Sequence, residues 1–194
     1  MSRAPADPWK EALACSLRAH GAPLTAIYRH AADTYPEECC GFVRRSGKVH
    51  RAINYQNVLH AEDPALWPHS AREAYSLSPS DLYLLGLSFF GDDPAIVVYH
   101  SHPDCSAYFS DKDAADALWD GRQIYDVDHL VINVSRGRPL GAKLYQFVRS
   151  GFRCVWSDDV DRGRGAHRPR EVWRPDGGER STAILASKGS RKNK

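Results

Sequence analysis

One short stretch, AIVVYHSH at residues 95–102, constrains the fold more than any other part of the chain. It is apolar and β-branched at successive positions and too short for a typical helix, so it favours a strand. A strand without alternating polar positions is typical of the buried interior of a sheet. Pro103 follows directly and has no backbone N–H to donate, so we expect the strand to end there. The sequence therefore predicts a sheet that contains this buried strand.

The rest of the chain alternates between helical and strand-like patterns. Helices are expected at residues 22–35, 78–91 and 110–122, and strands at 40–45, 48–57, 129–135 and 142–148. Ser46 and Gly47 separate the first two strands and favour a hairpin. Residues 57–76 show no clean period and are expected to form a long loop or insertion. Together these patterns predict an α/β fold of the α+β type.

The chain is expected to form one domain over residues 1–155 and a tail over residues 156–194. A length of 194 residues suits a single domain with a sizeable core. The tail segment is rich in Gly and Arg and carries ten Lys or Arg against six Asp or Glu. Such a composition buries little surface, so a mostly disordered, basic tail is expected. We interpret its charges as a solvated end, with contact to a partner or nucleic acid as the alternative.

Composition argues against several classes of function. The formal net charge of +2 gives no reason to expect nucleic acid or a membrane surface as a partner. The N-terminus carries charges where a signal peptide would need an apolar core, and no run is long enough to span a membrane. The five cysteines are odd in number and lack C-x-x-C spacing, which favours neither a disulfide framework nor a cysteine-rich zinc site. The expected location is the reducing cytoplasm.

His100 and His102 lie at positions i and i+2 of the expected strand, so their side chains project to the same face. Two adjacent, partly buried imidazoles are costly when both are charged, whereas two neutral ones suit a shared zinc ion. On its own, an H-x-H pair more often marks histidines of the core or surface. The pair alone therefore leaves both interpretations open.

Ser110 and Asp113 open the next expected helix with S-x-x-D spacing. The pattern is close to a capping box, with Ser110 as N-cap and Asp113 near the third helical position. A carboxylate that a loop returns to an H-x-H pair is also a natural third zinc ligand. Three protein ligands leave the fourth position to water, which is the arrangement of catalytic zinc sites.

A hydrolytic zinc site also needs a proton acceptor that does not ligate the metal. Glu37 and Glu38 precede the strand expected at residues 40–45, in which Gly41 allows close approach of another backbone. We interpret Glu37 as a solvated acid at a junction between helix and strand. Glu38 is the remaining candidate.

Two motifs carry a family resemblance. Residues 100–113, HSHPDCSAYFSDKD, match H-x-H-P-x(6)-S-x-x-D at every defined position, and EECCGF matches an E-x-x-G element through Glu38 and Gly41. By these motifs the chain resembles the JAMM (MPN+; Mov34/MPN/PAD-1 type) zinc metallopeptidases over roughly residues 20–150. The resemblance implies a single MPN domain, with a mixed central β-sheet flanked by helices as in cytidine deaminases. The chain looks most like the small stand-alone prokaryotic members.

The resemblance also implies a role for each motif residue. One zinc ion per chain would be held by three ligands, His100, His102 and Asp113. Glu38 would be the general base, and Ser110 would donate a hydrogen bond to the oxyanion of the tetrahedral intermediate.

Two neighbours of the ligands are given no part in this chemistry. Ser101 lies between the two histidines and faces away from the metal. Cys105 lies in the ligand loop and is interpreted as a bystander. For Cys105, a fourth metal ligand and a redox-sensitive thiol are the alternatives.

The resemblance implies hydrolysis of the amide or isopeptide bond after the C-terminal glycine of a ubiquitin-like protein, in sulfur-carrier maturation or modifier deconjugation. Residues 113–147 are compact and leave no room for the long second insertion of eukaryotic deubiquitinases. The substrate would be the ubiquitin-like protein or its conjugate, and an E1-like adenylating enzyme would act in the same pathway. The alternatives are a non-catalytic MPN scaffold subunit and a zinc hydrolase of small amides.

Overall fold

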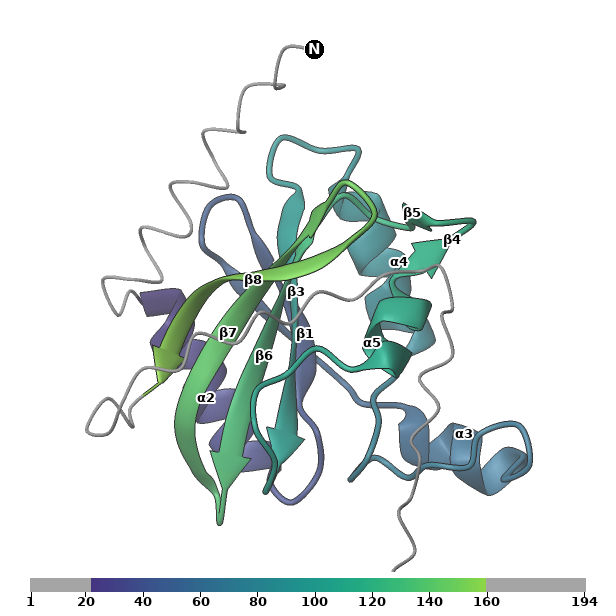
Figure 1. The fold of residues 1–194 in the computed structure, drawn as a ribbon. Helices are drawn as coiled ribbons and strands as arrows, with labels where there is room; N and C mark the ends of the chain where they lie inside the picture. Colours follow the sequence, from purple (N-terminus) through teal and green to yellow (C-terminus); the bar gives the residue numbers. More distant parts are fainter. Residues whose placement is uncertain (1–21, 160–194) are drawn as a thin grey trace, which may run out of the picture.

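A six-stranded mixed β-sheet forms the centre of the protein (Figure 1). The structure is a computed structural model, and it describes residues 22–159. The strand order is β2-β1-β3-β6-β7-β8; β3 and β6 run parallel, and the other neighbouring pairs are antiparallel. The strands are β1 (Cys40–Arg44), β2 (Val49–Ala52), β3 (Ala95–Pro103), β6 (Asp128–Ser135), β7 (Arg138–Val148) and β8 (Gly151–Asp159). The strand that opened the sequence argument, β3, lies inside the sheet as expected.

Helices cover both faces of this sheet. They are α2 (Ala22–Thr34), α3 (Gln56–Glu62), α4 (Pro79–Ser88) and α5 (Asp111–Asp116). Helix α2 packs on one face, and α4 and α5 pack on the other (Figure 1). This arrangement confirms the expected fold class, a mixed central sheet flanked by helices.

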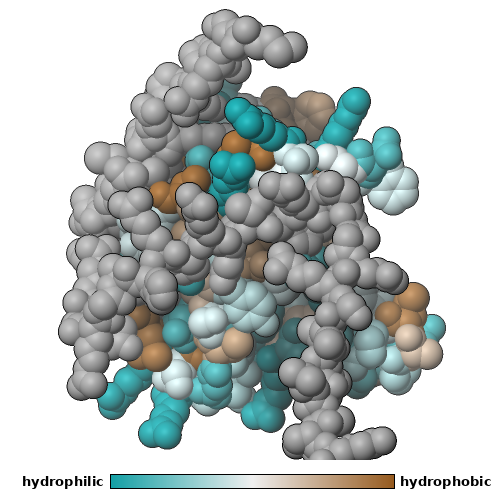
Figure 2. Space-filling model, in the orientation of Figure 1, coloured by the Kyte–Doolittle hydropathy of each residue, from teal (hydrophilic) through white to brown (hydrophobic). Residues whose placement is uncertain are grey.

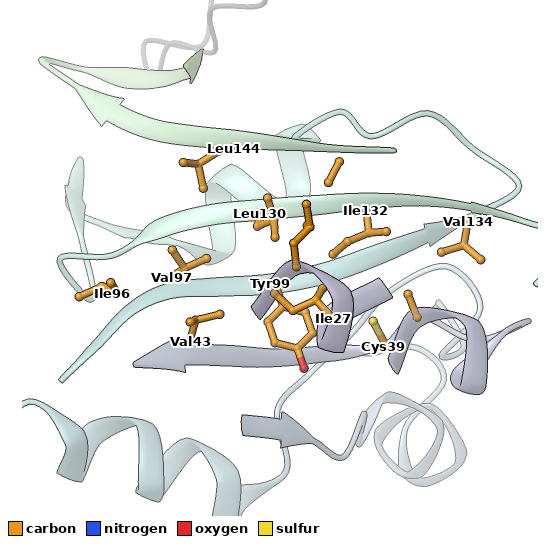
Figure 3. Close-up of a cluster of buried hydrophobic side chains, with 13 residues drawn as sticks. Ile27, Cys39, Val43, Ile96, Val97, Tyr99, Leu130, Ile132, Val134 and Leu144 are labelled. Atoms are coloured by element: carbon orange, nitrogen blue, oxygen red, sulfur yellow. The ribbon is translucent and has the colours of Figure 1, made fainter. Parts of the chain in front are cut away.

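The face under α2 holds the larger apolar core (Figure 3). Leu24, Ile27 and Ala31 recur at helical spacing and are buried against the sheet. Strand β3 contributes Val97 and Tyr99 to the same cluster. Burial of each large side chain stabilises the fold by about 1.5–3 kcal/mol relative to its exposure, so α2 is held mainly by this apolar face.

On the other face, α4 and α5 pack over separate apolar clusters. Leu85 of α4 packs with Phe42 and Val98, and Ala114 of α5 packs in a cluster with Val131. Helix α4 begins after Ser78, whose side chain accepts a hydrogen bond from the backbone N–H of Asp81. The helix ends at Ser88, three residues before the expected Gly91.

The alternation of side chains along β3 decides which residues reach which face. Tyr99 and Ser101 project toward α2, whereas Val98, His100 and His102 project toward α4 and α5. The two histidines therefore share a face, as the sequence predicted. They lie where β3 ends and the chain turns toward α5 (Figure 1).

The prediction of a helix at residues 110–122 is wrong beyond Asp116. Helix α5 has only six residues, and the chain then forms a small hairpin of β4 (Leu118–Trp119) and β5 (Arg122–Gln123). Asp120 and Gly121 join the two strands with φ of 49° and 70°. Asp-Gly favours such tight hairpin turns because both residues adopt left-handed backbone conformations at low cost.

The strand expected at residues 48–57 is also too long. Strand β2 ends at Ala52, and α3 begins at Gln56, inside the expected strand. The expected insertion at residues 57–76 therefore contains most of a short helix, followed by irregular chain.

Strand β8 was not expected, and it crosses the predicted end of the domain. It pairs with β7 through Asp159, and Trp156 packs against the core under α2. The predicted boundary after residue 155 is therefore too early, because an edge strand tolerates the charged residues that suggested a tail. The rest of the predicted tail, 160–194, and residues 1–21 lie outside the described residues. Within residues 22–159, no helix is both long and apolar enough to cross a membrane.

Candidate metal centre

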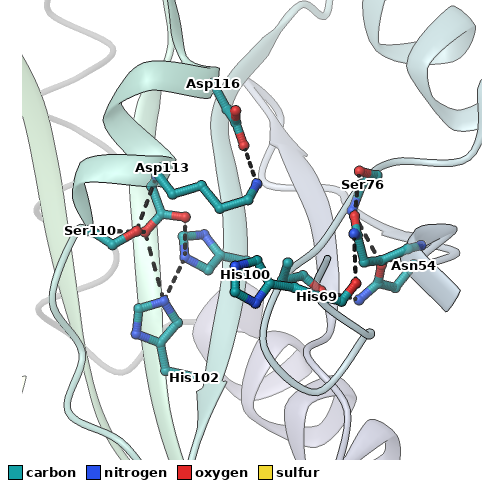
Figure 4. A network of polar contacts seen from close by, with 11 residues as sticks. Asn54, His69, Ser76, His100, His102, Ser110, Asp113 and Asp116 are labelled. Carbon is teal, nitrogen blue, oxygen red and sulfur yellow. Dashed lines mark hydrogen bonds and ion pairs between the residues drawn. The ribbon is translucent and has the colours of Figure 1, made fainter. Parts of the chain in front are cut away.

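His100 and His102 bring two imidazole nitrogens together at the end of β3. Their Nε2 atoms are 3.1 Å apart, and both side chains are buried (Figure 4). The ring of His100 is also covered from the opposite side by Tyr75, which stacks on it with centroids 4.5 Å apart. The two rings are therefore held in one orientation, with their Nε2 atoms directed at a common point.

Asp113 adds a carboxylate to the same point from the start of α5. Its Oδ1 lies 3.5 Å from His100 Nε2, and its Oδ2 lies 3.8 Å from His102 Nε2 (Figure 4). The loop between β3 and α5 is anchored by Phe109, which packs in the cluster beneath α5. Burial of this aromatic side chain returns the helix start to the two histidines.

The three side chains fit a divalent metal ion such as zinc. Among the described residues, His100, His102 and Asp113 form the group whose ligand atoms lie within 4.8 Å of one another. Zinc bonds of about 2.0–2.2 Å place tetrahedral neighbours roughly 3.3–3.6 Å apart. The observed separations of 3.1, 3.5 and 3.8 Å lie around that range. Two imidazoles and one carboxylate are also a donor set typical of catalytic zinc.

Hydrogen bonding favours the tautomer of His102 that binds metal through Nε2. Its Nδ1 lies 3.2 Å from the carbonyl oxygen of Ser106, an acceptor that requires the proton on Nδ1. The Nε2 lone pair then points toward the ion. In the part of the chain that the structure describes, the buried Nδ1 of His100 has no hydrogen-bond partner.

Charge at the site follows from burial and from the carboxylate. Burial and the neighbouring His100 lower the pKa of His102 to about 4, so its ring is neutral at pH 7. Burial also disfavours the charged form of His100, but attraction to Asp113 outweighs it and raises the pKa. Burial works against the Asp113 anion too, yet His100 and Ser110 hold the pKa of this carboxyl well below its ordinary value. The site thus contains a permanent anion and one neutral imidazole, both ready to coordinate a cation.

Glu38 lies in the same cavity without belonging to the ligand group. The cavity has a volume of about 250 Å³, and Glu38 lines it together with His102, Ser110 and Asp113. Burial raises the pKa of Glu38 to about 7. A carboxyl group with this pKa both accepts and releases protons near neutral pH.

Gly41 explains how β1, which begins two residues after Glu38, packs so closely on β3. A Cβ atom at this position would lie 2.2 Å from the His50 carbonyl oxygen and 2.5 Å from the Tyr99 hydroxyl oxygen. Any larger residue would push the strands apart. The glycine of the E-x-x-G element is therefore required by the packing of β1 between β2 and β3.

Ser110 forms the capping box that its sequence pattern predicted. Its hydroxyl donates to Asp113 Oδ2 at 2.7 Å, its backbone N–H donates to the same oxygen, and it accepts from the Asp113 N–H. The capping and ligand interpretations of Asp113 are thus compatible, because the capping bonds leave the carboxylate facing the histidines. In this geometry the hydroxyl of Ser110 orients the carboxylate of Asp113.

Three residues near the site were given no role by sequence reasoning. Tyr75 covers His100, and Lys112 lines the cavity while pairing with Asp116 at 2.6 Å. Ser101 faces away from the ligands, as expected, but its Oγ accepts a hydrogen bond from the Cys39 N–H at 2.8 Å. No periodic signal marks Tyr75, because it lies in irregular chain.

Cys105 lines the cavity and is exposed, but it does not belong to the converging ligand group of the described residues. The geometry gives no support to a fourth protein ligand at this position. The interpretation of Cys105 as a bystander, with a redox-sensitive thiol as the alternative, stays a prediction.

A family of known proteins matches most of the described residues. Residues 22–138 match the family of prokaryotic homologs of the JAB domain. The chain belongs to this family. The JAB/MPN group to which the motifs assigned the chain is thereby confirmed, and this group includes metallopeptidases.

One relative is a phage protein, the tail tip assembly protein K of Escherichia phage N15. It is 36% identical over 92 residues, which are 47% of this chain and 32% of the phage protein. The chain thus spans about a third of the length of this relative.

Two solution structures resemble the fold. A Desulfitobacterium hafniense protein is 17% identical, with a TM-score of 0.47, over 75% of this chain and 95% of its own. A Salinibacter ruber protein is 23% identical, with a TM-score of 0.39, over 81% of this chain and 91% of its own.

Proposed function

We propose that this JAB-domain protein is a zinc metallopeptidase that cleaves the bond after the C-terminal glycine of a ubiquitin-like protein. One observation supports catalysis above all: a buried carboxyl group, Glu38, shares a cavity with His102 and Asp113, two of the three converging side chains. A structural metal site would need the ligands but not this fourth group, whose burial is costly.

Amide hydrolysis needs metal binding, proton transfer and stabilisation of the oxyanion, and different side chains supply each. A zinc ion held by His100, His102 and Asp113 would supply Lewis acidity toward the scissile carbonyl group and toward an attacking water. Glu38 accepts the proton of that water and returns it to the leaving nitrogen, as its pKa of about 7 allows. Ser110 stabilises the oxyanion once its hydroxyl turns from Asp113 toward the substrate.

The proposed substrate is an extended, glycine-ended chain, because such a chain fits beside buried catalytic groups. Between α5 and β6 the molecule carries only the short β4–β5 hairpin, where larger deubiquitinases would carry a second insertion. A small ubiquitin-like protein, matured or removed from a conjugate, fits this compact site better than a ubiquitin chain. We further propose a cytoplasmic pathway that includes an E1-like adenylating enzyme.

Cleavage of matched fusions tests the proposal. A ubiquitin-like protein ending in Gly-Gly is fused to a reporter through an amide bond, beside a fusion ending in Ala-Ala and a small chromogenic amide. We expect zinc-dependent cleavage of the Gly-Gly fusion that stops when a chelator is added. Cleavage of the small amide alone would instead favour a small-amide hydrolase, and cleavage of none with zinc bound would favour a scaffold.

A further inference from the structure

A single side chain in the irregular segment, that of Asn54, makes four hydrogen bonds. Its Nδ2 donates to the carbonyl oxygens of Glu38 and Ala74, at 2.9 and 3.1 Å. Its Oδ1 accepts from the backbone N–H groups of Gln56 and Ser76, at 3.0 and 3.2 Å. One amide group thus uses both of its N–H donors and both lone pairs of its oxygen.

These four bonds join the two parts of the cavity wall that the H-x-H-P motif does not supply. The bond to the Glu38 carbonyl oxygen holds the residue proposed as the general base. The bonds to Ala74 and Ser76 hold the residues on either side of Tyr75, whose ring stacks on His100 at an interplanar angle of 20°. Asn54 and Ser76 lie side by side in Figure 4.

We propose that Asn54 is a positioning residue. Through one amide group it fixes the position of Glu38, the proposed base, and the position of Tyr75, whose ring stacks on His100. It reaches the metal through Tyr75 and His100, and the reaction through Glu38. The catalytic half of this inference rests on the proposed function, whereas the half that concerns metal binding does not.

The site of Asn54 requires a side chain that donates hydrogen bonds, and an ionised Asp of the same shape cannot donate them. Two carbonyl oxygens face Nδ2, and a carboxylate oxygen in its place would repel both. The two N–H groups that face Oδ1 would keep their acceptor. Asn54→Asp thus removes the bonds to Glu38 and Ala74 while it keeps size and shape.

Backbone hydrogen bonds hold the same segment without the side chain of Asn54. The backbone of residues 53–55 bonds directly to that of 76–78, through Tyr55 N to Ser76 O at 2.8 Å and Ser78 N to Ile53 O at 3.1 Å. We therefore expect an Asn54 variant to fold.

Zinc affinity, measured by chelator competition, tests the proposal without reference to activity. Because partners of a metal ligand typically change affinity by about 10–100-fold, we expect Asn54→Asp to bind zinc at least about tenfold more weakly. In zinc-saturated protein, its kcat should fall by about tenfold or more with little change in KM, since misplacement of a base acts in the transition state.

Gln56→Leu is the matched control. Gln56 is a buried amide of the same segment that bonds to His69 O and Ser76 Oγ but not to Glu38. We expect it to lower the free energy of unfolding while zinc affinity stays within about threefold. Wild-type zinc affinity in Asn54→Asp, or an equal loss in Gln56→Leu, would overturn the proposal.

The two proposals fail in different ways. A wild-type protein that binds zinc and cleaves nothing would contradict the proposed function, and the zinc affinity of Asn54→Asp would still decide the role of Asn54. Unchanged kcat in zinc-saturated Asn54→Asp, beside an active wild type, would overturn the placement of Glu38 by Asn54.

Discussion

Polar side chains are buried on both faces of β3, but the two faces differ in how the hydrogen-bonding groups of these side chains are paired. Toward α2, the Tyr99 hydroxyl pairs with His30 Nδ1 at 2.8 Å, and Ser101 Oγ accepts from a backbone N–H. Toward α5, His100 and His102 are as deeply buried, yet their Nε2 atoms face each other and a carboxylate. Buried polar groups whose hydrogen bonds are complete stabilise a fold, whereas converging lone pairs form a coordination site. Neighbouring residues of one strand thus complete hydrogen bonds on one face and form a candidate metal site on the other.

The largest expected effect is the loss of metal from the α5 face. The wild-type protein should carry about one zinc per chain, and His102→Ala or Asp113→Ala should reduce this to the background of elemental analysis, because two ligands do not hold the ion. Asp116→Ala is the control, since this carboxylate lies on α5 but pairs with Lys112. Full zinc content in either ligand variant would refute the assignment.

The next effect separates catalysis from metal binding. Glu38→Gln keeps the shape of the side chain and loses the base, so cleavage of a Gly-Gly fusion should fall at least about a hundredfold, with zinc content unchanged. Glu37→Gln is the control, because Glu37 bonds to Asn57 and does not line the cavity. Near-normal turnover in Glu38→Gln, or a matching loss in Glu37→Gln, would show that another group moves the proton.

On the α2 face the comparison predicts a loss of stability without a loss of metal. Tyr99→Phe leaves the buried His30 Nδ1 without its partner, so the free energy of unfolding should fall by about 1–3 kcal/mol while zinc content is retained. Urea denaturation of the variant and of Tyr83→Phe, a change at an exposed tyrosine, measures the difference. Loss of zinc in Tyr99→Phe would mean that the two faces are coupled.

The smallest effect is a pH dependence of stability from the same face. Burial lowers the pKa of His30 from 6.5 to about 4, so between these values the unfolded chain binds more protons than the folded one. Stability from His30 is therefore complete above pH 6.5 and falls as the pH drops toward 4. In zinc-loaded protein, the free energy of unfolding should depend less steeply on pH in His30→Gln than in the wild type. The difference in slope should correspond to at most about one bound proton. An identical pH profile in both proteins would show that His30 is not the titrating group.

Sequence reasoning succeeded where a pattern is local. The apolar run of β3, the pairing of His100 with His102 on one face and the cap formed by Ser110 and Asp113 all depend on residues within a few positions of each other. It failed beyond Asp116, where a tight hairpin replaced the expected helix, and at β8, an edge strand that includes residues 156–159 of the expected tail. In both cases pairing or turn geometry outweighed the intrinsic preference of the segment.

By itself, then, the sequence indicated which three side chains would converge, because His100 and His102 share one face of a strand and Asp113 begins the helix that follows. Only the tertiary structure decided the rest of the site. The pKa of Glu38 depends on how deeply the chain before β1 is buried, and Tyr75 meets His100 across 24 intervening positions. Asn54 joins these parts through bonds to residues up to 22 positions away. Such contacts arise from the packing of the whole chain, which leaves no periodic pattern in any one segment.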